Sequence, residues 1–249
     1  MTTLAVTGNY LRSNLAVSMR QVGFLVFTIA MPVGLYLMFS QIFGDLPAGA
    51  TDVRTLMMIA MAIYGAFGAA ISAGAQLQVE RRTGWFRQLM LSGLTPAGFL
   101  TGKIVGAMVQ VLPAIIAVFV CGFLTGVRLP ATQWLLIGVL IWITLLPMVV
   151  LGVVIALWFA PSTVGALSTI LLLALSMLGG LWVPVSQMPE SMRRLAEAMP
   201  THWMNTIANW PVLGGDFPTR GVLVLGVWLL GLAVLGVLGY RRAVRSSRR

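Results

Sequence analysis

The stretch QVERRTGWFRQLMLSGLTPAGFLTGKI, residues 78 to 104, is the most charged interior segment of a chain that is otherwise strongly apolar. It holds four basic residues and one acidic residue, Glu80. Apolar runs flank it on both sides, and each is long enough for a membrane-spanning helix, which needs about 20 residues. We therefore expect a loop between two spans, and the side of the membrane on which it lies fixes the topology.

The composition of the whole chain predicts a membrane protein. Hydrophobic residues make up 59% and charged residues 9%, with a mean hydropathy of +0.95, against about 25% charged residues in soluble domains. We expect an all-α integral membrane protein, a single domain over residues 1–249 with short loops. A signal peptide ending at 47–50 is the weaker alternative for the first apolar run. The six expected spans are about 22–43, 55–79, 103–125, 134–159, 163–183 and 220–240.

The basic residues predict the orientation, because Lys and Arg gather in cytoplasmic loops. Six spans place both termini on one side of the inner membrane, and that side has only Glu80 as an acid. Its basic residues are Arg12, Arg20, Arg81, Arg82, Arg87, Lys103, Arg241, Arg242, Arg245, Arg248 and Arg249. The other side carries five basic residues, Arg54, Arg128, Arg193, Arg194 and Arg220, and five acidic ones, Asp45, Asp52, Glu190, Glu197 and Asp216. The basic side is therefore expected to be cytoplasmic, and its charge to contact anionic lipid rather than nucleic acid.

The interiors of the expected spans lack ionised side chains, which argues against a proton- or ion-coupled transporter. Hydrogen bonding between helices is the simpler interpretation of their mild polar groups, and contact with a transported molecule is the alternative. The candidates for such a pathway are Tyr36, Tyr64, Gln76, Gln110 and Ser176.

Small residues and prolines predict local features of the spans. The run GAFGAAISAGA, residues 65 to 75, predicts close helix packing, either within the subunit or at a subunit interface. Pro32, Pro113 and Pro147 fall inside spans and are expected to interrupt them, since proline removes a backbone hydrogen bond.

Enzyme and metal sites find little support in the sequence. An intramembrane serine protease needs a Ser and a His at membrane depth, whereas the one histidine, His202, lies outside the apolar runs. Zinc needs three or four ligands, and the one cysteine, Cys121, lies in an apolar span. The segment GFLTGKI, residues 98 to 104, fails as a phosphate-binding loop because its glycine spacing is short and Ile follows the Lys. We expect no enzyme activity, cofactor or metal in this chain.

The opening segment predicts an amphipathic helix over about 81–92. Trp85, Phe86, Leu89 and Met90 share one face, while basic residues lie elsewhere. Such a helix is either a structural element at the cytoplasmic membrane surface or a docking element for a cytoplasmic partner.

Two blocks of sequence resemble the ABC-2 type transporter permeases. In the first block, a pattern of Glu, Gly, Pro and a Gly-Lys pair is matched by Glu80, Arg82, Gly84, Arg87, Leu89, Pro96 and Lys103. In the second, a Gly-Gly and proline pattern between the fifth and sixth spans is matched by Gly179, Gly180, Pro184, Pro189, Glu190 and Pro200. Together with the six spans, the resemblance covers nearly the whole chain.

The resemblance implies a permease that pairs with a second, identical permease chain in a homodimer. It also implies two copies of a separate ATPase subunit, which binds ATP and Mg. The coupling residues would be Glu80, Arg81, Arg82, Gly84, Trp85, Phe86, Arg87 and Leu89. Short external helices over about 184–212 would partly re-enter the membrane, with Gly179, Gly180, Pro184, Pro189 and Pro200 at an external gate. The segment 190–199 would be an amphipathic helix, with Met192, Leu195, Ala196 and Met199 on one face.

The resemblance and the apolar spans together favour export of a hydrophobic or amphipathic small molecule, such as a drug, an antibiotic or a lipid-like compound. Export of a lipid, a glycan precursor or haem is the alternative within the family. An ATPase-independent channel is the alternative outside it.

Overall fold

The computed structural model describes residues 26–44, 52–82 and 96–246, and every regular element in these ranges is a helix. The predicted all-α class is confirmed for this part of the chain. In chain order the elements are η1 (Val26–Ala30), α3 (Met31–Phe43), α4 (Val53–Arg82), α6 (Pro96–Gln110), α7 (Leu112–Leu124), α8 (Ala131–Thr144), α9 (Leu146–Trp158), α10 (Pro161–Leu178), η2 (Val185–Gln187), α11 (Glu190–Ala196), α12 (Pro200–Leu213) and α13 (Thr219–Ser246).

Five segments of the described chain are long and apolar enough to cross a bilayer, and they follow the predicted order. They are Val53–Gly74, Thr101–Leu124, Ala131–Trp158, Pro161–Leu178 and Thr219–Arg242. The apolar helix Thr28–Phe43 is shorter and corresponds to the predicted span 22–43, whose first residues lie outside the described ranges. The chain is thus a multi-pass helical protein, and the sixth crossing remains a prediction.

The predicted end of the fifth span, residue 183, is wrong. Helix α10 ends at Leu178 and is closed by Gly179 and Gly180, the latter with a φ of +79° that favours glycine. The amide of Gly180 donates to the carbonyl of Met177, and the amide of Leu181 donates to that of Ser176. This pair of bonds is a Schellman motif, which ends a helix by satisfying its last carbonyls.

Three prolines interrupt apolar helices, as predicted. Helix α6 gives way to α7 at Val111, two residues before Pro113, and α8 gives way to α9 at Leu145, two residues before Pro147. The π-helical turn η1 likewise changes into α3 just before Pro32. In each case proline has no amide hydrogen to donate, and its ring takes up space near the preceding turn, so the helical hydrogen bonds do not run on without a break.

The interruptions of α6–α7 and α8–α9 are joined by a side chain. The indole nitrogen of Trp142, in α8, donates to the carbonyl oxygen of Met108, in α6, over 2.7 Å. Each of these residues lies three positions before its break, and the two spans run in opposite directions, so the two breaks lie on opposite sides of this bond along the bundle.

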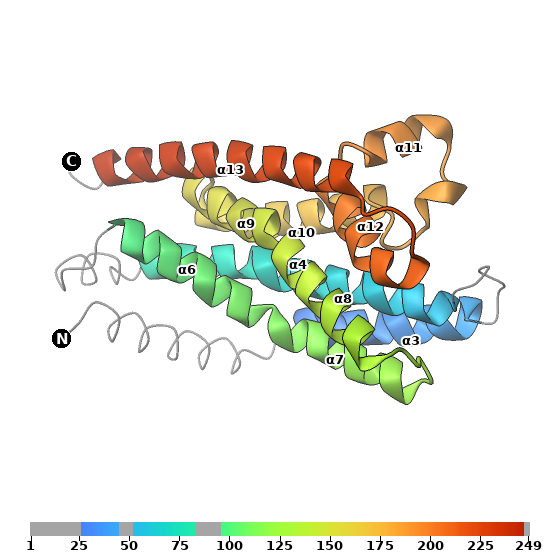
Figure 1. Ribbon diagram of the computed structural model, residues 1–249. Coiled ribbons are helices and arrows are strands. Elements are labelled where there is room, and N and C mark those ends of the chain that lie inside the picture. The colour runs from blue at the N-terminus through green and yellow to red at the C-terminus, as the bar shows by residue number, and fades with distance from the viewer. Residues whose placement is uncertain (1–25, 45–51, 83–95, 247–249) are drawn as a thin grey trace.

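Helix α4 runs through the centre of the bundle and contacts α3, α7, α9, α10 and α12 (Figure 1). Its segment 58–71 is buried on nearly every side, with Met61, Ile63 and Phe67 fully enclosed. A helix that is apolar all round and rich in small residues suits such a position, because its neighbours can approach from all directions.

The small residues of 65–75 are used for packing within the subunit. A Cβ atom added to Gly74 would lie 2.0 Å from the carbonyl oxygen of Gly152 in α9, so the two backbones touch directly. A Cβ on Gly65 would lie 2.7 Å from the ring of Pro32 in α3. The predicted close packing is therefore confirmed, and it joins α4 to α9 and α3.

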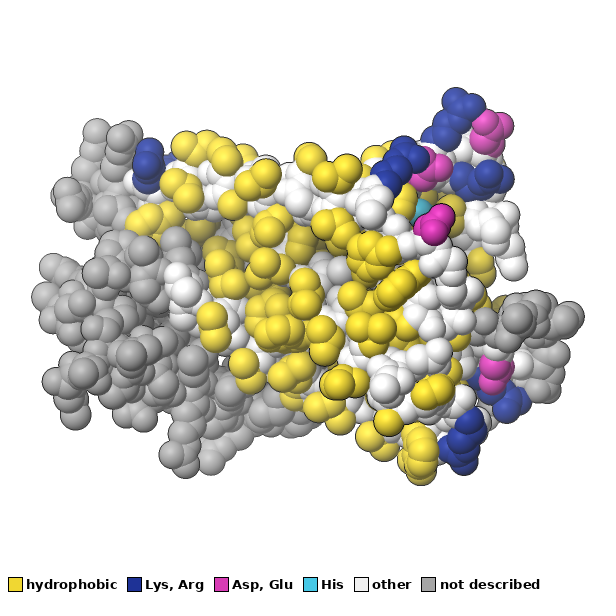
Figure 2. Space-filling model, in the orientation of Figure 1, with side chains coloured by type: hydrophobic (Ala, Val, Ile, Leu, Met, Phe, Trp, Pro, Cys, Tyr) yellow, Lys and Arg dark blue, Asp and Glu magenta, His cyan; other side chains and the backbone are white. Residues whose placement is uncertain are grey.

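The visible surface has a broad apolar middle between charged ends (Figure 2). Helix α13 contributes large side chains that the rest of the described chain leaves exposed, among them Leu223, Val227 and Leu230. Exposed Leu and Val over the middle of long helices are suited to lipid contact.

We predict that Gly74→Ala destabilises the protein, because the added methyl group collides with the backbone of Gly152 and forces α4 and α9 apart. Overpacking of this kind costs about 1–3 kcal/mol. Gly34→Ala in α3 is the matched control, since nothing lies within 4 Å of its Cβ position. Thermal unfolding in detergent should show a lower midpoint for Gly74→Ala alone; equal midpoints for both variants would contradict the contact.

Candidate functional site

The two ends of the bundle differ in charge. At one end, which we call the basic end, lie the C-terminal ends of α4 and α13 and the start of α6 (Figure 1), and α13 carries exposed Arg241 and Arg242 there. The opposite end, the mixed end, carries acidic and basic side chains together (Figure 2). Its described charged residues are Asp52, Arg54, Arg128, Glu190, Arg193, Arg194, Glu197, Asp216 and Arg220. The predicted segregation of charge is thus present in the described residues.

The predicted coupling residues begin where α4 ends. Glu80, Arg81 and Arg82 are the last three residues of α4, at the basic end; the description of the structure does not extend to their side chains. Gly84, Trp85, Phe86, Arg87 and Leu89 lie outside the described residues.

Two of the predicted pathway residues are tyrosines buried inside the subunit. The hydroxyl of Tyr36 shares a 2.6 Å hydrogen bond with that of Thr125, which joins α3 to the turn after α7. The hydroxyl of Tyr64 points to the sulfur of Met31 at 3.7 Å, and its ring packs edge-on against Trp182 with centroids 5.7 Å apart. The two tyrosines therefore belong to separate contact groups, each joining elements of one subunit.

Two further pathway candidates carry buried polar atoms that have no partner in the described structure. They are the side-chain nitrogen of Gln110, at the end of α6, and the hydroxyl of Ser176, in the last turn of α10. Such atoms are costly to bury without a hydrogen bond. The side chain of Gln76 lies outside the described part of the chain. Of the other four candidates, Tyr36 and Tyr64 contact different partners.

The predicted gate residues mark the boundaries of the elements between α10 and α13. Gly179 and Gly180 end α10. Pro184 precedes η2, Pro189 precedes α11, and Pro200 is the first residue of α12, a position that suits proline because the amide there needs no helical partner. The predicted short helices are present at the mixed end.

Helix α12 is held tightly against the end of α10. The hydroxyl of Thr201 donates to the carbonyl oxygen of Leu175 over 2.5 Å. A Cβ on Gly179 would lie 2.0 Å from that hydroxyl oxygen. Because glycine has no side chain, the Thr201 hydroxyl has room to form this hydrogen bond.

The predicted apolar face of the segment 190–199 is only partly correct. Ala196 is buried and Met192 and Met199 are half-buried, whereas Leu195 is 46% exposed. Helix α11 ends at Ala196 and a turn carries the chain to Met199, so a single helical face does not run through all four residues. Leu195 lies inside α11, but no other described element covers most of its side chain.

Tryptophan side chains fix the turn between α11 and α12 to α12 and α13, a role that our sequence analysis missed. The indole of Trp203 donates to the carbonyl of Glu197 over 2.7 Å. The indole of Trp228, in α13, donates to the carbonyl of Ala198 over 2.9 Å. Because a buried indole N–H needs an acceptor, the Trp residues around this segment were the signal available in the sequence.

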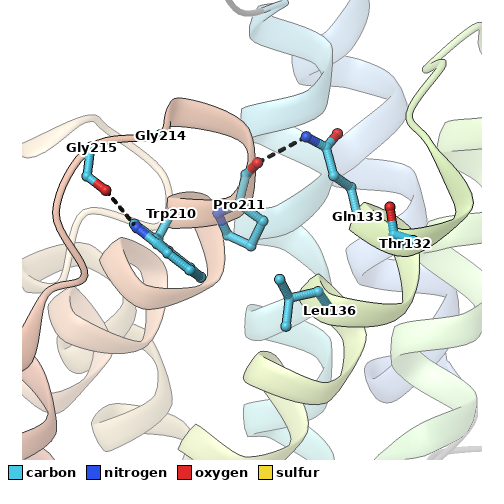
Figure 3. Close-up of a pocket in the computed structure, with 7 residues that line it drawn as sticks. All are labelled: Thr132, Gln133, Leu136, Trp210, Pro211, Gly214 and Gly215. Carbon is cyan, nitrogen blue, oxygen red and sulfur yellow. Dashed lines mark hydrogen bonds between the residues drawn. The ribbon is translucent and has the colours of Figure 1, made fainter.

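A pocket of about 250 Å³ opens between the start of α8 and the end of α12 (Figure 3). The side-chain nitrogen of Gln133 donates to the carbonyl oxygen of Pro211 over 2.9 Å and bridges the two helices. The indole of Trp210 donates to the carbonyl oxygen of Gly215 over 3.0 Å. The lining residues are Thr132, Gln133, Leu136, Trp210, Pro211, Gly214 and Gly215.

His202 is part of the packing of α12. Burial lowers the pKa of its imidazole, and the charge of Glu197 opposes this shift, so the ring is neutral near pH 7. It packs edge-on against Trp203 with centroids 5.0 Å apart. Within the described residues, no three His, Cys, Asp or Glu side chains are grouped as metal ligands.

We predict that Gly179→Ala disrupts the attachment of α12 to α10, because the methyl group takes the place of the Thr201 hydroxyl. Loss of one hydrogen bond and a steric clash should cost about 1–3 kcal/mol. Limited proteolysis should cut the segment 181–199 faster than in the wild type. Gly226→Ala in α13 has open space around its Cβ position and should leave the rate unchanged; equal rates for the two variants would refute the assignment.

Comparison with known proteins agrees with this architecture. The model of the ABC-2 type transporter family matches residues 9–210, which is most of the chain. A protein of Bacillus subtilis (strain 168) named "Putative transport permease YvfS" is 24% identical over 210 residues, covering 83% of this chain and 85% of that protein. The chain therefore belongs to the ABC-2 type transporter family, as a membrane permease of an ABC transporter.

Proposed function

We propose that this chain is the permease of an ATP-driven exporter and works with two copies of a separate ATPase, which bind ATP and Mg. The observation that supports this most is the course of α4. Its last residues, Glu80 to Arg82, begin the motif that resembles the coupling segment, and its middle forms the core of the bundle. A displacement of 81–92 would therefore act directly on the most heavily packed helix.

The direction of this coupling follows from the contacts of α4. At the depth of Tyr64, α4 packs against Trp182, in the segment that leads from α10 to η2. Helix α4 also contacts α12. One continuous helix thus links the predicted ATPase-docking segment to the predicted external gate.

The polar groups inside the bundle support a hydrophobic or amphipathic substrate. Tyr36, Tyr64, Gln110 and Ser176 offer hydroxyl and amide groups in apolar surroundings. These groups can hydrogen-bond a neutral or weakly polar molecule, whereas a buried ion would need charged partners or a ring of oxygen ligands. We propose export of such a molecule from the cytoplasm or the inner leaflet.

The exposed faces of the helices support a homodimer. Helix α10 is largely uncovered in the subunit. Beside the apolar Ile170, Leu173 and Met177, its exposed residues include small or hydroxyl side chains: Ser162, Thr163, Gly165, Ala166, Thr169 and Ala174. Faces of this kind favour helix association in membranes, where Leu- and Val-rich faces favour lipid. We propose that this face meets a second copy of the chain.

The charge distribution supports the orientation. The basic end would face the cytoplasm of a cell with an inner membrane, with both termini there, and the mixed end would face outward. The same orientation brings 81–92 to the compartment that holds ATP.

The first test is purification of the tagged chain from its native membrane, with mass spectrometry of bound proteins and an ATPase assay. Recovery of an ATPase with a phosphate-binding loop, in equal numbers with the permease, would support the proposal. An isolated chain that conducts ions or solutes without ATP would instead favour the channel.

We predict that Trp85→Ala, Phe86→Ala and Arg87→Glu each weaken ATPase binding and stimulation. Trp and Arg anchors at an interface commonly contribute about 2 kcal/mol, so the affinity should fall by roughly tenfold or more. The three variants should still insert into the membrane. Val227→Ala, on an α13 side chain that is 70% exposed, is the control and should couple normally; unchanged stimulation in all three coupling variants would contradict the assignment.

A further inference from the structure

The pocket between α8 and α12 lies at the mixed end, away from the end of α4 at which the predicted ATPase-docking segment begins. We propose that it binds an uncharged amphipathic molecule, with the apolar body against Trp210, Pro211 and Leu136 and a hydroxyl or carbonyl group at Thr132 and Gln133. The proposal does not depend on ATPase coupling.

The opening is a consequence of how α12 ends. Pro211 lies in its last turn, and Gly214 and Gly215 follow with φ values of +72° and +82°. Two successive glycines with positive φ turn the chain sharply, and they contribute no side chains. The wall next to Trp210 is therefore left open.

The orientation of Trp210 gives the pocket an apolar surface. Its N–H is already bonded to Gly215 within the same turn, and its ring packs edge-on against Phe217 with centroids 5.1 Å apart. Figure 3 shows the ring lying beside Pro211, with Leu136 facing it from α8. A saturated or aromatic body can pack here without leaving the indole N–H unbonded.

The opposite wall is polar and carries no ionised group. The nitrogen of Gln133 is held by Pro211, which leaves its side-chain oxygen as an acceptor. Thr132 adds a hydroxyl that can donate or accept. None of the lining residues is charged, so the group that binds here is expected to be neutral.

The size and the position of the pocket restrict further the class of ligand that it can bind. A volume of about 250 Å³ lies below the roughly 300–1,000 Å³ of sites for whole drug-sized ligands, so the pocket holds one part of a longer molecule. It lies at the mixed end, and Trp side chains are typical of the membrane–water boundary. A neutral lipid with a free hydroxyl and an exported amphipath share this chemistry.

The test uses the whole chain in phosphatidylcholine nanodiscs. The photoreactive probe is a dodecanol that carries a diazirine, and the comparison probe is the alkane of the same length that carries the same diazirine. Labelled peptides are mapped by mass spectrometry. The alcohol should label residues around Trp210 and Leu136 about fivefold more than the alkane does, the difference expected from one hydrogen bond.

Leu136→Trp and Leu135→Trp form a matched pair. The two leucines are neighbours in α8 and both are exposed, at 39% and 71%, but only Leu136 lines the pocket. Leu136→Trp should fill the pocket and abolish the local labelling, whereas Leu135→Trp should leave it unchanged. Thr132→Val should reduce labelling by the alcohol alone, and unfolding midpoints equal to that of the wild type would show that the variants are folded.

The proposal is overturned if labelling is equal in the two Trp variants, or if the alcohol and the alkane label alike. A further arm separates the two sources of the ligand. Loss of labelling when diacylglycerol is added assigns the site to membrane lipid. Labelling that resists diacylglycerol and falls only during ATP hydrolysis by the assembled transporter assigns it to the exported molecule.

Discussion

The contact of α4 with α9 at Gly74 and Gly152 sets the arrangement of the other helices. Because the two backbones touch, no side chain lies between the helices at this point, and α4 is held at the centre. The remaining helices then pack around α4, whose surface of Ala, Gly and Ile accepts neighbours on every side. In a membrane, where lipid is as apolar as the helices, such direct packing supplies much of the attraction between spans.

At the mixed end, hydrogen bonds add to the packing. In the segment between α10 and α13, Met204, Ile207 and Ala208 of α12 are buried in the common apolar core. Backbone carbonyls accept further bonds from Thr201, Trp203, Trp228 and Gln133. Bonds of this kind are individually modest, so apolar burial holds α12 in place, and the hydrogen bonds fix its two ends and the turn before it.

Much of the fold could be predicted from the sequence because apolar length and charge asymmetry are strong signals. Apolar length predicted the order of the spans. The positions of Pro32, Pro113 and Pro147 predicted the interruptions, and the small residues of 65–75 predicted close packing. The end of α10 was missed because an apolar run continues past Gly180, and only the left-handed conformation of that glycine ends the helix. The exposure of Leu195 and the pocket at Trp210 depend on where short helices end and how they pack. Neither property follows from periodicity alone.

The hydrogen bond from Trp142 to Met108 has a mechanical consequence. It joins the third and fourth spans three residues before each is interrupted. A bend at one interruption would stretch this bond unless the other span bent as well. The two spans would therefore articulate as a single jointed pair, and α9, which follows the second joint and touches α4 at Gly152, would move with the central helix.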